Sequence, residues 1–444
     1  MTIIANTQIT PDQEKEFDWK NCWYPVTFLQ DLTPEKLYSF SIYDQPLVLF
    51  KNQNGEFGCV KDFCPHRAAK LSDGKIIDGK IECPYHGWQF NQDGKCLHIP
   101  QLPKDAKIPH NACIQSYQVV EKQGIIWVWL GDKSQHQEAS IPTLSDLEDD
   151  QFVTIDFMYE RPYDQSYFIE NVIDPAHIPI SHDGSDGKRE NAQPLEFRII
   201  ESSLKIIRSQ YRNTREDNAI WINLDIVTPN LVLYRICDFP KPGLITGLAL
   251  YSIPTHRGKC RVLSRYYRNY ETWKIKLQPR WFSHFYRIRV VEEDIQVTQG
   301  VQSQIERANK NLNELYLPLK SSDTLSIEYR KWLDKYGASL PFYQGYTTSK
   351  LTNCDLQSQE IYNHSLARFE RHTKICSSCY QAYQTTKLAK KGFIFIGIIL
   401  AAIAIITDNS PISNIAVFTS LLSFGLAFAA EKLKLKFERP YIRS

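Results

Sequence analysis

Strand-like runs of apolar and polar residues, each bounded by turn residues, fill residues 23–135. Residues 125–130 (IIWVWL) form a continuous apolar run, which predicts a buried strand that closes this region. Four dipeptides typical of hairpin turns lie between the runs: Asn54-Gly55, Asp73-Gly74, Asp78-Gly79 and Asp93-Gly94. We therefore expect an all-β domain over residues 23–135, after a polar N-terminal segment of residues 1–22.

A polar linker, residues 131–150, separates this region from a second one with a mixed pattern. In residues 151–345, strand-like runs such as residues 231–234 and 248–251 alternate with helical stretches around residues 165–182 and 285–317. This mixture predicts a sheet with a helix packed across it. No internal repeat is present.

Two apolar segments lie near the C-terminus. Residues 392–406 are apolar throughout, residues 412–430 carry only small or singly polar interruptions, and residues 408–411 form a turn between them. We expect a transmembrane hairpin over residues 392–430, after a segment of residues 346–391 and before a cytoplasmic tail of residues 431–444. The alternative is a buried or subunit-contacting helix pair, because the first span is short.

Lysines flank this hairpin on both sides, and the turn carries no Lys or Arg. They are Lys387, Lys390 and Lys391 before it, and Lys432, Lys434 and Lys436 after it. The positive-inside rule then places both ends, and the rest of the chain, on the cytoplasmic (or stromal-equivalent) side of a plasma or thylakoid membrane.

Length, charge and cysteine usage narrow the class of protein. The 444 residues suffice for two to three domains, and a net charge of +2 without a basic stripe argues against a nucleic-acid partner. Residues 1–20 contain no apolar stretch, so they are not a signal peptide. Eleven unevenly spread cysteines do not resemble a secreted disulfide framework and favour a reducing compartment.

Two short motifs within the β domain each hold one cysteine and one histidine: Cys64-Pro-His66 and Cys83-Pro-Tyr-His86. Two thiolates on one iron and two imidazoles on the other are the ligands of a Rieske [2Fe–2S] cluster. A zinc site is the alternative, although zinc motifs usually pair cysteine with cysteine and histidine with histidine.

A second constellation in the mixed region suits a mononuclear iron. His177 and His182, with Asp174 just before them, offer the two imidazoles of a non-haem Fe(II) site, which also needs one carboxylate. Asp294 is the best candidate for that carboxylate, at the edge of a buried helix face, with Glu292 and Glu293 in water. Alternatively, both histidines are ordinary loop or helix-end residues and the carboxylates form a solvated acidic turn.

The chain resembles the Rieske oxygenases of the pheophorbide a oxygenase type, from about Trp23 to the C-terminus. The resemblance covers both cluster motifs, the segment from Glu170 to His177 with His182, and Asp294-Ile-Gln-Val-Thr-Gln-Gly. It also covers His372-Thr-Lys-Ile-Cys376-Ser-Ser-Cys379 and the apolar segments after it. No long plastid transit sequence precedes the catalytic part, which suggests a prokaryotic or already mature chain.

This resemblance implies an α+β protein with a Rieske domain, a helix-grip (START-like) catalytic domain and a membrane hairpin. It implies His177, His182 and Asp294 as iron ligands, and Asp174 as a bridge between an iron-ligating histidine and a cluster histidine of a neighbouring subunit in a homotrimer. The substrate it implies is a chlorophyll-derived tetrapyrrole. Because no G-x-G-x-x-G follows a strand, electrons are expected from a separate protein such as a ferredoxin.

Cys376 and Cys379 form a C-x-x-C pair with three possible roles. The resemblance favours a reversible redox pair served by thioredoxin. His364 and His372 could instead complete a zinc site, or the thiols could be inert. The function expected for the whole chain is an iron-dependent oxygenase; the alternative is a membrane-tethered Rieske protein for electron transfer or redox sensing.

Overall fold

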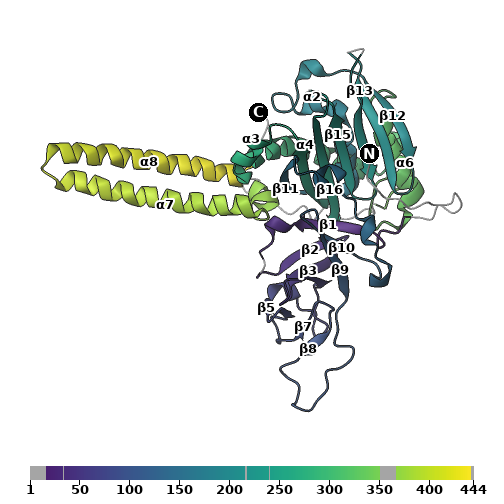
Figure 1. Ribbon diagram of the computed structural model, residues 1–444, viewed down its shortest axis with the longest axis horizontal. Helices are drawn as coiled ribbons and strands as arrows, with labels where there is room; N and C mark the ends of the chain where they lie inside the picture. The colour runs from purple at the N-terminus through teal and green to yellow at the C-terminus, as the bar shows by residue number, and fades with distance from the viewer. Residues whose placement is uncertain (1–16, 34, 216–217, 240, 351–366, 442–444) are drawn as a thin grey trace. The chain divides into compact units, whose positions relative to one another are not determined.

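A computed structural model describes residues 17–33, 35–215, 218–239, 241–350 and 367–441 (Figure 1). The chain divides into two compact units. The first unit comprises Met1–Leu277 and Asp294–Asp355, and the second unit comprises Gln278–Glu293 and Leu356–Ser444. Residues 278–293, which the sequence analysis assigned to the catalytic domain, therefore group with the C-terminal residues.

The N-terminal part of the first unit contains a six-stranded antiparallel sheet. Its strands, in spatial order, are β1 (Trp23–Phe28), β10 (Ile125–Trp129), β9 (Ser116–Lys122), β4 (Phe57–Lys61), β3 (Gln45–Lys51) and β2 (Tyr38–Ile42). All five residues of β10 are buried, because both faces of this strand are covered. The apolar run at residues 125–130 therefore predicted a buried strand correctly.

A smaller four-stranded sheet follows; the first cluster motif lies in the loop that leads into it and the second lies between two of its strands. Its strands are β5 (Lys75–Ile77), β6 (Lys80–Glu82), β7 (Gln89–Phe90) and β8 (Cys96–His98). Asp78 and Gly79 join β5 to β6 with φ angles of 47° and 71°, the left-handed conformation that a two-residue hairpin requires. Asp73-Gly74, by contrast, ends a 3-10 turn (Leu71–Asp73) and forms no hairpin.

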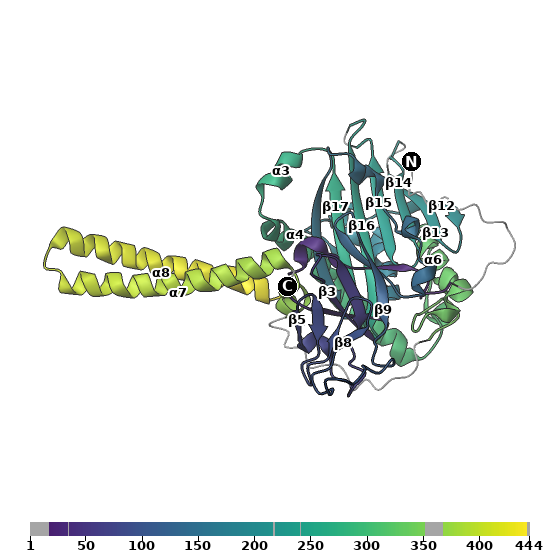
Figure 2. The same cartoon turned by 60° about the horizontal axis from the view of Figure 1, so that its bottom comes forward.

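Seven antiparallel strands form the large sheet of the first unit. In spatial order they are β11 (Val153–Arg161), β17 (Lys259–Arg268), β16 (Ile245–His256), β15 (Leu231–Cys237), β14 (Ile222–Val227), β13 (Ile206–Asn213) and β12 (Leu195–Ser202). Figure 2 shows β14 to β17 side by side. The strand-like runs at residues 231–234 and 248–251 lie in β15 and β16, as expected.

Helices accompany this sheet and carry the second constellation. They are α1 (Gln165–Val172), the 3-10 turn η6 (Pro175–His177), α2 (Ile178–Ser181), α3 (Thr272–Leu277), α4 (Arg280–Ala308), α5 (Leu312–Leu315) and α6 (Thr324–Tyr336). The helical stretch expected around residues 165–182 is thus broken into three pieces. In α4, the Gln302 amide donates to the Asp164 carboxylate at 3.1 Å, which ties this helix to the start of α1.

Hydrogen bonds from backbone and side-chain donors join the two β-regions of the first unit. The Tyr43 N–H donates to the Pro254 carbonyl at 2.7 Å, and the Asn230 side chain donates to the Trp23 carbonyl at 2.7 Å. Arg265 of β17 forms a buried ion pair with Asp156 and also donates to the Gln123 carbonyl at 2.7 Å. These bonds explain why residues on either side of the linker belong to one unit.

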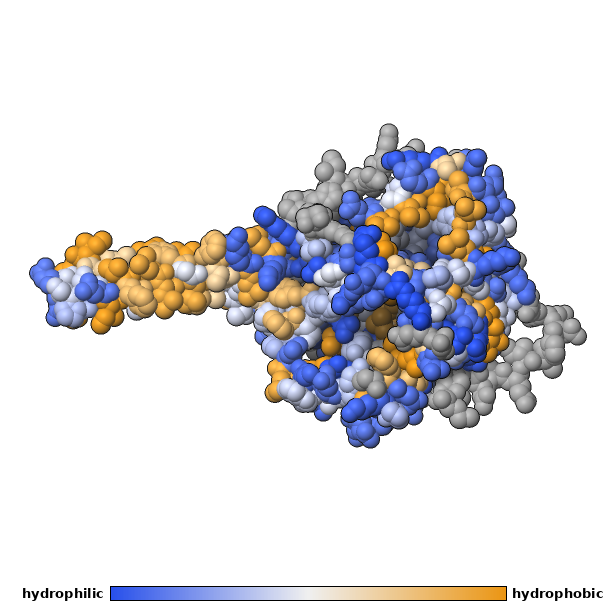
Figure 3. Space-filling view, turned by 90° about the horizontal axis from the view of Figure 1, so that it is seen from above, coloured by the Kyte–Doolittle hydropathy of each residue, from blue (hydrophilic) through white to orange (hydrophobic). Residues whose placement is uncertain are grey.

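The second unit is dominated by a helical hairpin of α7 (Ser377–Ile406) and α8 (Ser410–Glu438). Both helices are long and apolar enough to cross a membrane. Only 6% of the most apolar window of α7 and 22% of that of α8 is buried, which is too little for the core helices of a soluble protein. Figure 3 shows apolar residues along the hairpin and hydrophilic residues at its turn.

Candidate metal centres

The first cluster loop, between β4 and β5, bends sharply around Cys64. The Cys64 N–H donates to the Ala69 carbonyl and the Ala68 N–H donates to the Cys64 carbonyl, both at 2.9 Å. Ala68 takes a φ of 59°, which a residue with a side chain rarely adopts. This closed loop places Cys64 and His66 at one tip.

The second cluster loop, between β6 and β7, has the same design. The Cys83 N–H donates to the Trp88 carbonyl at 2.8 Å, and the Gly87 N–H donates to the Cys83 carbonyl at 3.1 Å. Gly87 takes a φ of 72°, for which glycine needs no strain. Cys83 and His86 therefore lie at the tip of a matching loop.

The two tips meet, as their sequence spacing predicted. The rings of His66 and His86 lie 4.4 Å apart between centroids, and His66 stacks on Trp88 at 4.7 Å. Cys64 and Cys83 are only 1% and 2% exposed.

The donor set fits a [2Fe–2S] cluster. Among the described residues, His66 Nδ1 is buried without a hydrogen-bond partner, so its lone pair is available to a metal. Burial raises the pKa of the Cys64 thiol to about 11, so a thiolate at this position needs a bound cation to compensate it.

His177 and His182 are positioned by the broken helix after α1. Asp174 caps η6, because its Oδ1 accepts from the Ala176 N–H at 2.9 Å, and Pro175 starts the turn. The His182 N–H donates to the Ile178 carbonyl at 3.1 Å and ends α2. The two imidazoles therefore face each other, with ring centroids 5.2 Å apart.

Asp294 of α4 completes this group from a distant part of the sequence. Its Oδ1 lies 3.3 Å from His182 Nε2 and 3.7 Å from His177 Nε2. The ligand atoms of all three residues lie within 4.8 Å of one another, the arrangement that two histidines and one carboxylate need to hold one Fe(II) ion. Asp294 is 9% exposed, so the solvated acidic turn does not describe this residue.

The expectation that Glu292 and Glu293 lie in water is wrong. Glu292 is 6% exposed and forms a buried ion pair with Arg368. The side chain of Glu293 is 3% exposed and pairs with Arg289 at 3.1 Å. The apolar pattern of this short stretch did not reveal that the second unit supplies arginines to both carboxylates.

Asp174 lies beside the iron-ligand candidates. Its carbonyl oxygen contacts His177 Nδ1, and its carboxylate Oδ2 lies 3.9 Å from the same atom. This contact leaves His177 Nε2 to face Asp294, so Asp174 orients the ring of His177. Burial raises the pKa of Asp174, while the neighbouring His177 opposes the rise.

Sequence reasoning missed two residues that hold this region in place. Arg330 of α6 is fully buried and forms an ion pair with Glu170 of α1, whose carboxylate also accepts from the Tyr316 hydroxyl at 3.1 Å. Glu170 lies in the segment singled out before His177, but no local signal points to its partner.

Cys376 and Cys379 lie in the second unit as buried thiols, not joined as a disulfide. His372 lies with them as the sequence analysis expected, whereas His364 is outside the described residues. His284 of α4 joins the group, which no spacing in the sequence indicated. The neighbouring Cys379 and the two imidazoles hold the pKa of Cys376 well below its usual range.

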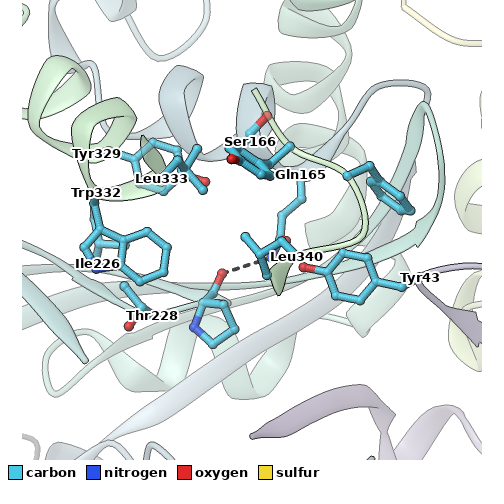
Figure 4. A pocket seen from close by; sticks show the side chains of 12 residues that line it. Tyr43, Gln165, Ser166, Ile226, Thr228, Tyr329, Trp332, Leu333 and Leu340 are labelled. Carbon is cyan, nitrogen blue, oxygen red and sulfur yellow. Dashed lines mark hydrogen bonds between the residues drawn. The ribbon is translucent and has the colours of Figure 1, made fainter. Parts of the chain in front are cut away.

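Figure 4 shows a pocket of the first unit. Side chains of α6, Gln165 and the Thr228-Pro229 turn line it, and Gln165 donates to the Pro229 carbonyl at 3.1 Å. None of the expected metal ligands lines this pocket, so we assign it no role in the chemistry.

Comparison with known proteins agrees with these two sites. Residues 22–118 match the Rieske [2Fe-2S] domain family, and residues 227–311 match the pheophorbide a oxygenase family. The protein TIC 55 of Pisum sativum is 34% identical over 428 residues, which cover 89% of this chain and 76% of that protein. The chain belongs to the Rieske oxygenases of the pheophorbide a oxygenase type.

Other members of this family span most of the chain. Pheophorbide a oxygenase of Arabidopsis thaliana is 28% identical over 98% of this chain and 85% of that protein. TIC 55 of Arabidopsis thaliana is 37% identical, but the chain spans only 65% of its length. The names of all three relatives place them in the chloroplast.

Solved structures support the fold. A dicamba monooxygenase bound to dicamba matches 72% of this chain and 98% of its own, with a TM-score of 0.60 and 22% identity. Pseudomonas putida NdmA matches 71% of this chain with a TM-score of 0.58 and 23% identity. The Rieske and catalytic parts of this Rieske oxygenase are thus of the expected α+β architecture.

Proposed function

We propose that this protein is a Rieske-type oxygenase that inserts oxygen from O2 into a large apolar ring, most simply a chlorophyll-derived tetrapyrrole. The observation that carries this proposal is the convergence of His177, His182 and Asp294 in a chain that also forms both cluster loops. The tetrapyrrole rests on the relatives named pheophorbide a oxygenase and chlorophyllide a oxygenase.

The residues divide the work between two metal groups. When bound, the cluster would pass electrons one at a time and the mononuclear iron would activate O2 beside the substrate. His177, His182 and Asp294 would hold the iron on one side and leave its other positions open. Asp174 would keep the His177 ring in one orientation and one tautomer.

Electrons would enter and cross between subunits at the cluster tip. Phe63 and Tyr85 flank the cluster loops and are 43% and 59% exposed, so they offer an apolar contact surface to a ferredoxin or a neighbouring subunit. In the homotrimer implied by the family, a cluster histidine of one subunit would bond to Asp174 of the next. That bond would link the cluster to the iron site through one carboxylate.

The hairpin would anchor the enzyme in a membrane with its base on the cytoplasmic or stromal-equivalent side. Lys390 of α7 and Lys434 of α8 both pair with Glu431, at 2.8 Å and 3.0 Å, near the base of the hairpin. Lysines lie at this end of the hairpin, and the turn at its other end contains no Lys or Arg. This distribution is the one that the positive-inside rule describes for an end that faces the cytoplasm.

Thioredoxin stays a prediction as a partner of Cys376 and Cys379. The two thiols are 0% and 1% exposed, so thioredoxin could reach them only after local opening of the second unit.

Anaerobic reconstitution with Fe(II) tests the proposed oxygenase against the electron-transfer alternative. An oxygenase should bind about one mononuclear iron per chain beyond the cluster, and Asp294→Ala should lose it. The reduced protein should then transfer isotope from labelled O2 into one member of a panel of chlorophyll derivatives. A protein that keeps its cluster, binds no further iron and labels no substrate would be an electron carrier.

A further inference from the structure

We propose that His284, His372, Cys376 and Cys379 hold a structural zinc ion in the second unit. The four residues come from α4, from a π-helical turn (Phe369–Thr373) and from the start of α7. All four are buried, with exposures of 0%, 1%, 0% and 1% respectively.

The distances between the ligand atoms fit one tetrahedral ion. Zinc at about 2.3 Å from sulfur and about 2.0 Å from nitrogen holds neighbouring S and N atoms roughly 3.5 Å apart. His284 Nδ1 lies 3.3 Å from Cys379 Sγ and 3.7 Å from Cys376 Sγ, and His372 Nε2 lies 3.2 Å from Cys379 Sγ. All four atoms lie within 4.8 Å of one another, which leaves room for one ion and not for a two-iron cluster.

The backbone around the site is shaped to present these atoms. Five residues form the π-helical turn that contains His372, a distortion found frequently at functional sites. The Cys376 N–H then donates to the His372 carbonyl at 3.1 Å, and Cys376 caps α7. The positive end of the α7 dipole favours thiolates at this position.

An apolar shell encloses the site and makes an ion-free state costly. Cys376 and Cys379 pack in a core with Tyr383 and Phe437, against Trp281, Phe285 and Phe369. Two imidazoles and two thiols in such a shell lose their hydration, and a bound cation compensates that loss. Each thiol would give up its proton as zinc binds, and no electrons would move.

A thioredoxin-regulated pair would need only the two cysteines and an accessible sulfur. It would not require two buried histidines, one of them from a helix far away in the sequence. Four converging ligands in a closed, tetrahedral set are instead the signature of a structural zinc site.

The proposed ion would fasten three segments at the base of the membrane hairpin. Thr373 already donates to the Phe437 carbonyl at 2.6 Å, which joins the π-helical turn to α8. His284 brings in α4, the helix that later carries Asp294. A zinc ion bound by these four residues would hold the start of α4 to the base of the α7–α8 hairpin.

Metal analysis of the full-length protein, purified in detergent without chelator, tests the proposal. We expect about one zinc per chain besides the iron. X-ray absorption at the zinc edge should show two sulfur and two nitrogen neighbours. A zinc shell of only nitrogen and oxygen would mean that zinc occupies the mononuclear iron site instead, and would overturn the proposal.

Single variants then assign the ligands. The variants His284→Ala and Cys376→Ser should each lose most of the zinc. The control variants His110→Ala and Cys113→Ser, which change exposed residues, should keep it. The spin-resonance signal of the Rieske cluster reports whether the first unit of each variant folds, and retention in the membrane fraction after carbonate treatment reports on the second unit. Zinc at the wild-type level in a folded His284→Ala variant would contradict the site. The site would also be contradicted if the wild-type protein contained no zinc and thioredoxin reduced a disulfide between Cys376 and Cys379.

Discussion

His66 offers a buried Nδ1 beside the ring of His86, and two buried cysteines lie in the same pair of loops. At the scale of single residues, the proposed chemistry depends on buried histidine and cysteine side chains. A bound metal ion would take the place of the hydrogen-bond partners that such buried groups usually have. Their neighbours decide which atom of each ligand faces the metal, as Asp174 does for His177.

We expect Cys64→Ser or His86→Ala to abolish the Rieske spin-resonance signal of the reduced protein. A serine hydroxyl is a poor substitute for a thiolate, and alanine offers no lone pair. Cys113→Ser, at an exposed cysteine, should leave the signal unchanged. Finding zinc and no sulfide in the cluster loops would refute the cluster.

Asp174→Asn should keep both metal centres and lower oxygenation by roughly 10-fold to 100-fold. The backbone carbonyl that contacts His177 stays, whereas the carboxylate proposed to bond a cluster histidine of the neighbouring subunit loses its charge. Iron analysis measures the mononuclear iron, spin resonance measures the cluster, and turnover measures oxygenation, so the three effects can be told apart. Asp183→Asn, at a partly exposed aspartate paired with Arg189, is the matched control and should keep full turnover. If Asp174→Asn loses the mononuclear iron, Asp174 is itself a ligand.

At the scale of elements, α1, η6 and α2 are short and need support from outside. Helices of this length are not stable by themselves. The buried pair of Glu170 and Arg330 supplies that support, and Gln302 holds the residue that precedes α1. The proposed iron ligands His177 and His182 are therefore only as rigid as the contacts of α1 with α6 and α4.

Arg330→Ala should destabilise the first unit by about 3–5 kcal/mol, since it leaves the mostly buried carboxylate of Glu170 with no cation beside it, only the Tyr316 hydroxyl. Arg208→Ala breaks a partly exposed ion pair with Glu201 and should cost about 0–1 kcal/mol. Thermal unfolding followed through the cluster signal compares the two variants. Equal midpoints would show that the buried pair does not support α1.

At the scale of the whole molecule, the oxygenase consists of a first unit with three sheets and a second unit built around an apolar hairpin. Two of our proposals belong to this scale. One is attachment to a membrane, and the other is transfer of electrons between the metal centres of neighbouring subunits.

Replacing residues 392–430 with a short Gly-Ser linker should release the protein from membranes and keep the cluster. This exchange retains Phe437 and Tyr383, which pack at the base of the hairpin, whereas simple truncation after Tyr383 would remove Phe437. The full-length chain should stay in the membrane pellet after carbonate treatment. Release of the full-length chain by carbonate would show that the hairpin does not span.

Subunit mixing tests the trimer. Cys64→Ser chains lack the cluster and His177→Ala chains lack an iron ligand, so each homotrimer should be inactive. Mixed trimers should regain part of the activity if a cluster in one subunit serves the iron in the next. A fully active monomer, or mixed trimers without activity, would refute electron transfer between subunits.

Several features of this protein could be predicted from the spacing of residues that are close together in the sequence. The cluster loops, the pair His177 and His182, the buried strand β10 and the apolar hairpin helices each depend on residues close together in the chain, where turn chemistry and periodicity act directly. The position of Asp294 at the edge of a buried helix face made it a candidate for the carboxylate ligand of the iron. Only the family resemblance strengthened this assignment.

Only the tertiary structure decided which distant residues meet. It brought Asp294 to the two histidines, paired Glu292 with Arg368 and placed His284 against the C-x-x-C pair. None of these partners is marked by local spacing, because a side chain on a helix shows which face is buried but not which residue it will contact. That choice depends on how the elements pack, and packing is a property of the whole fold.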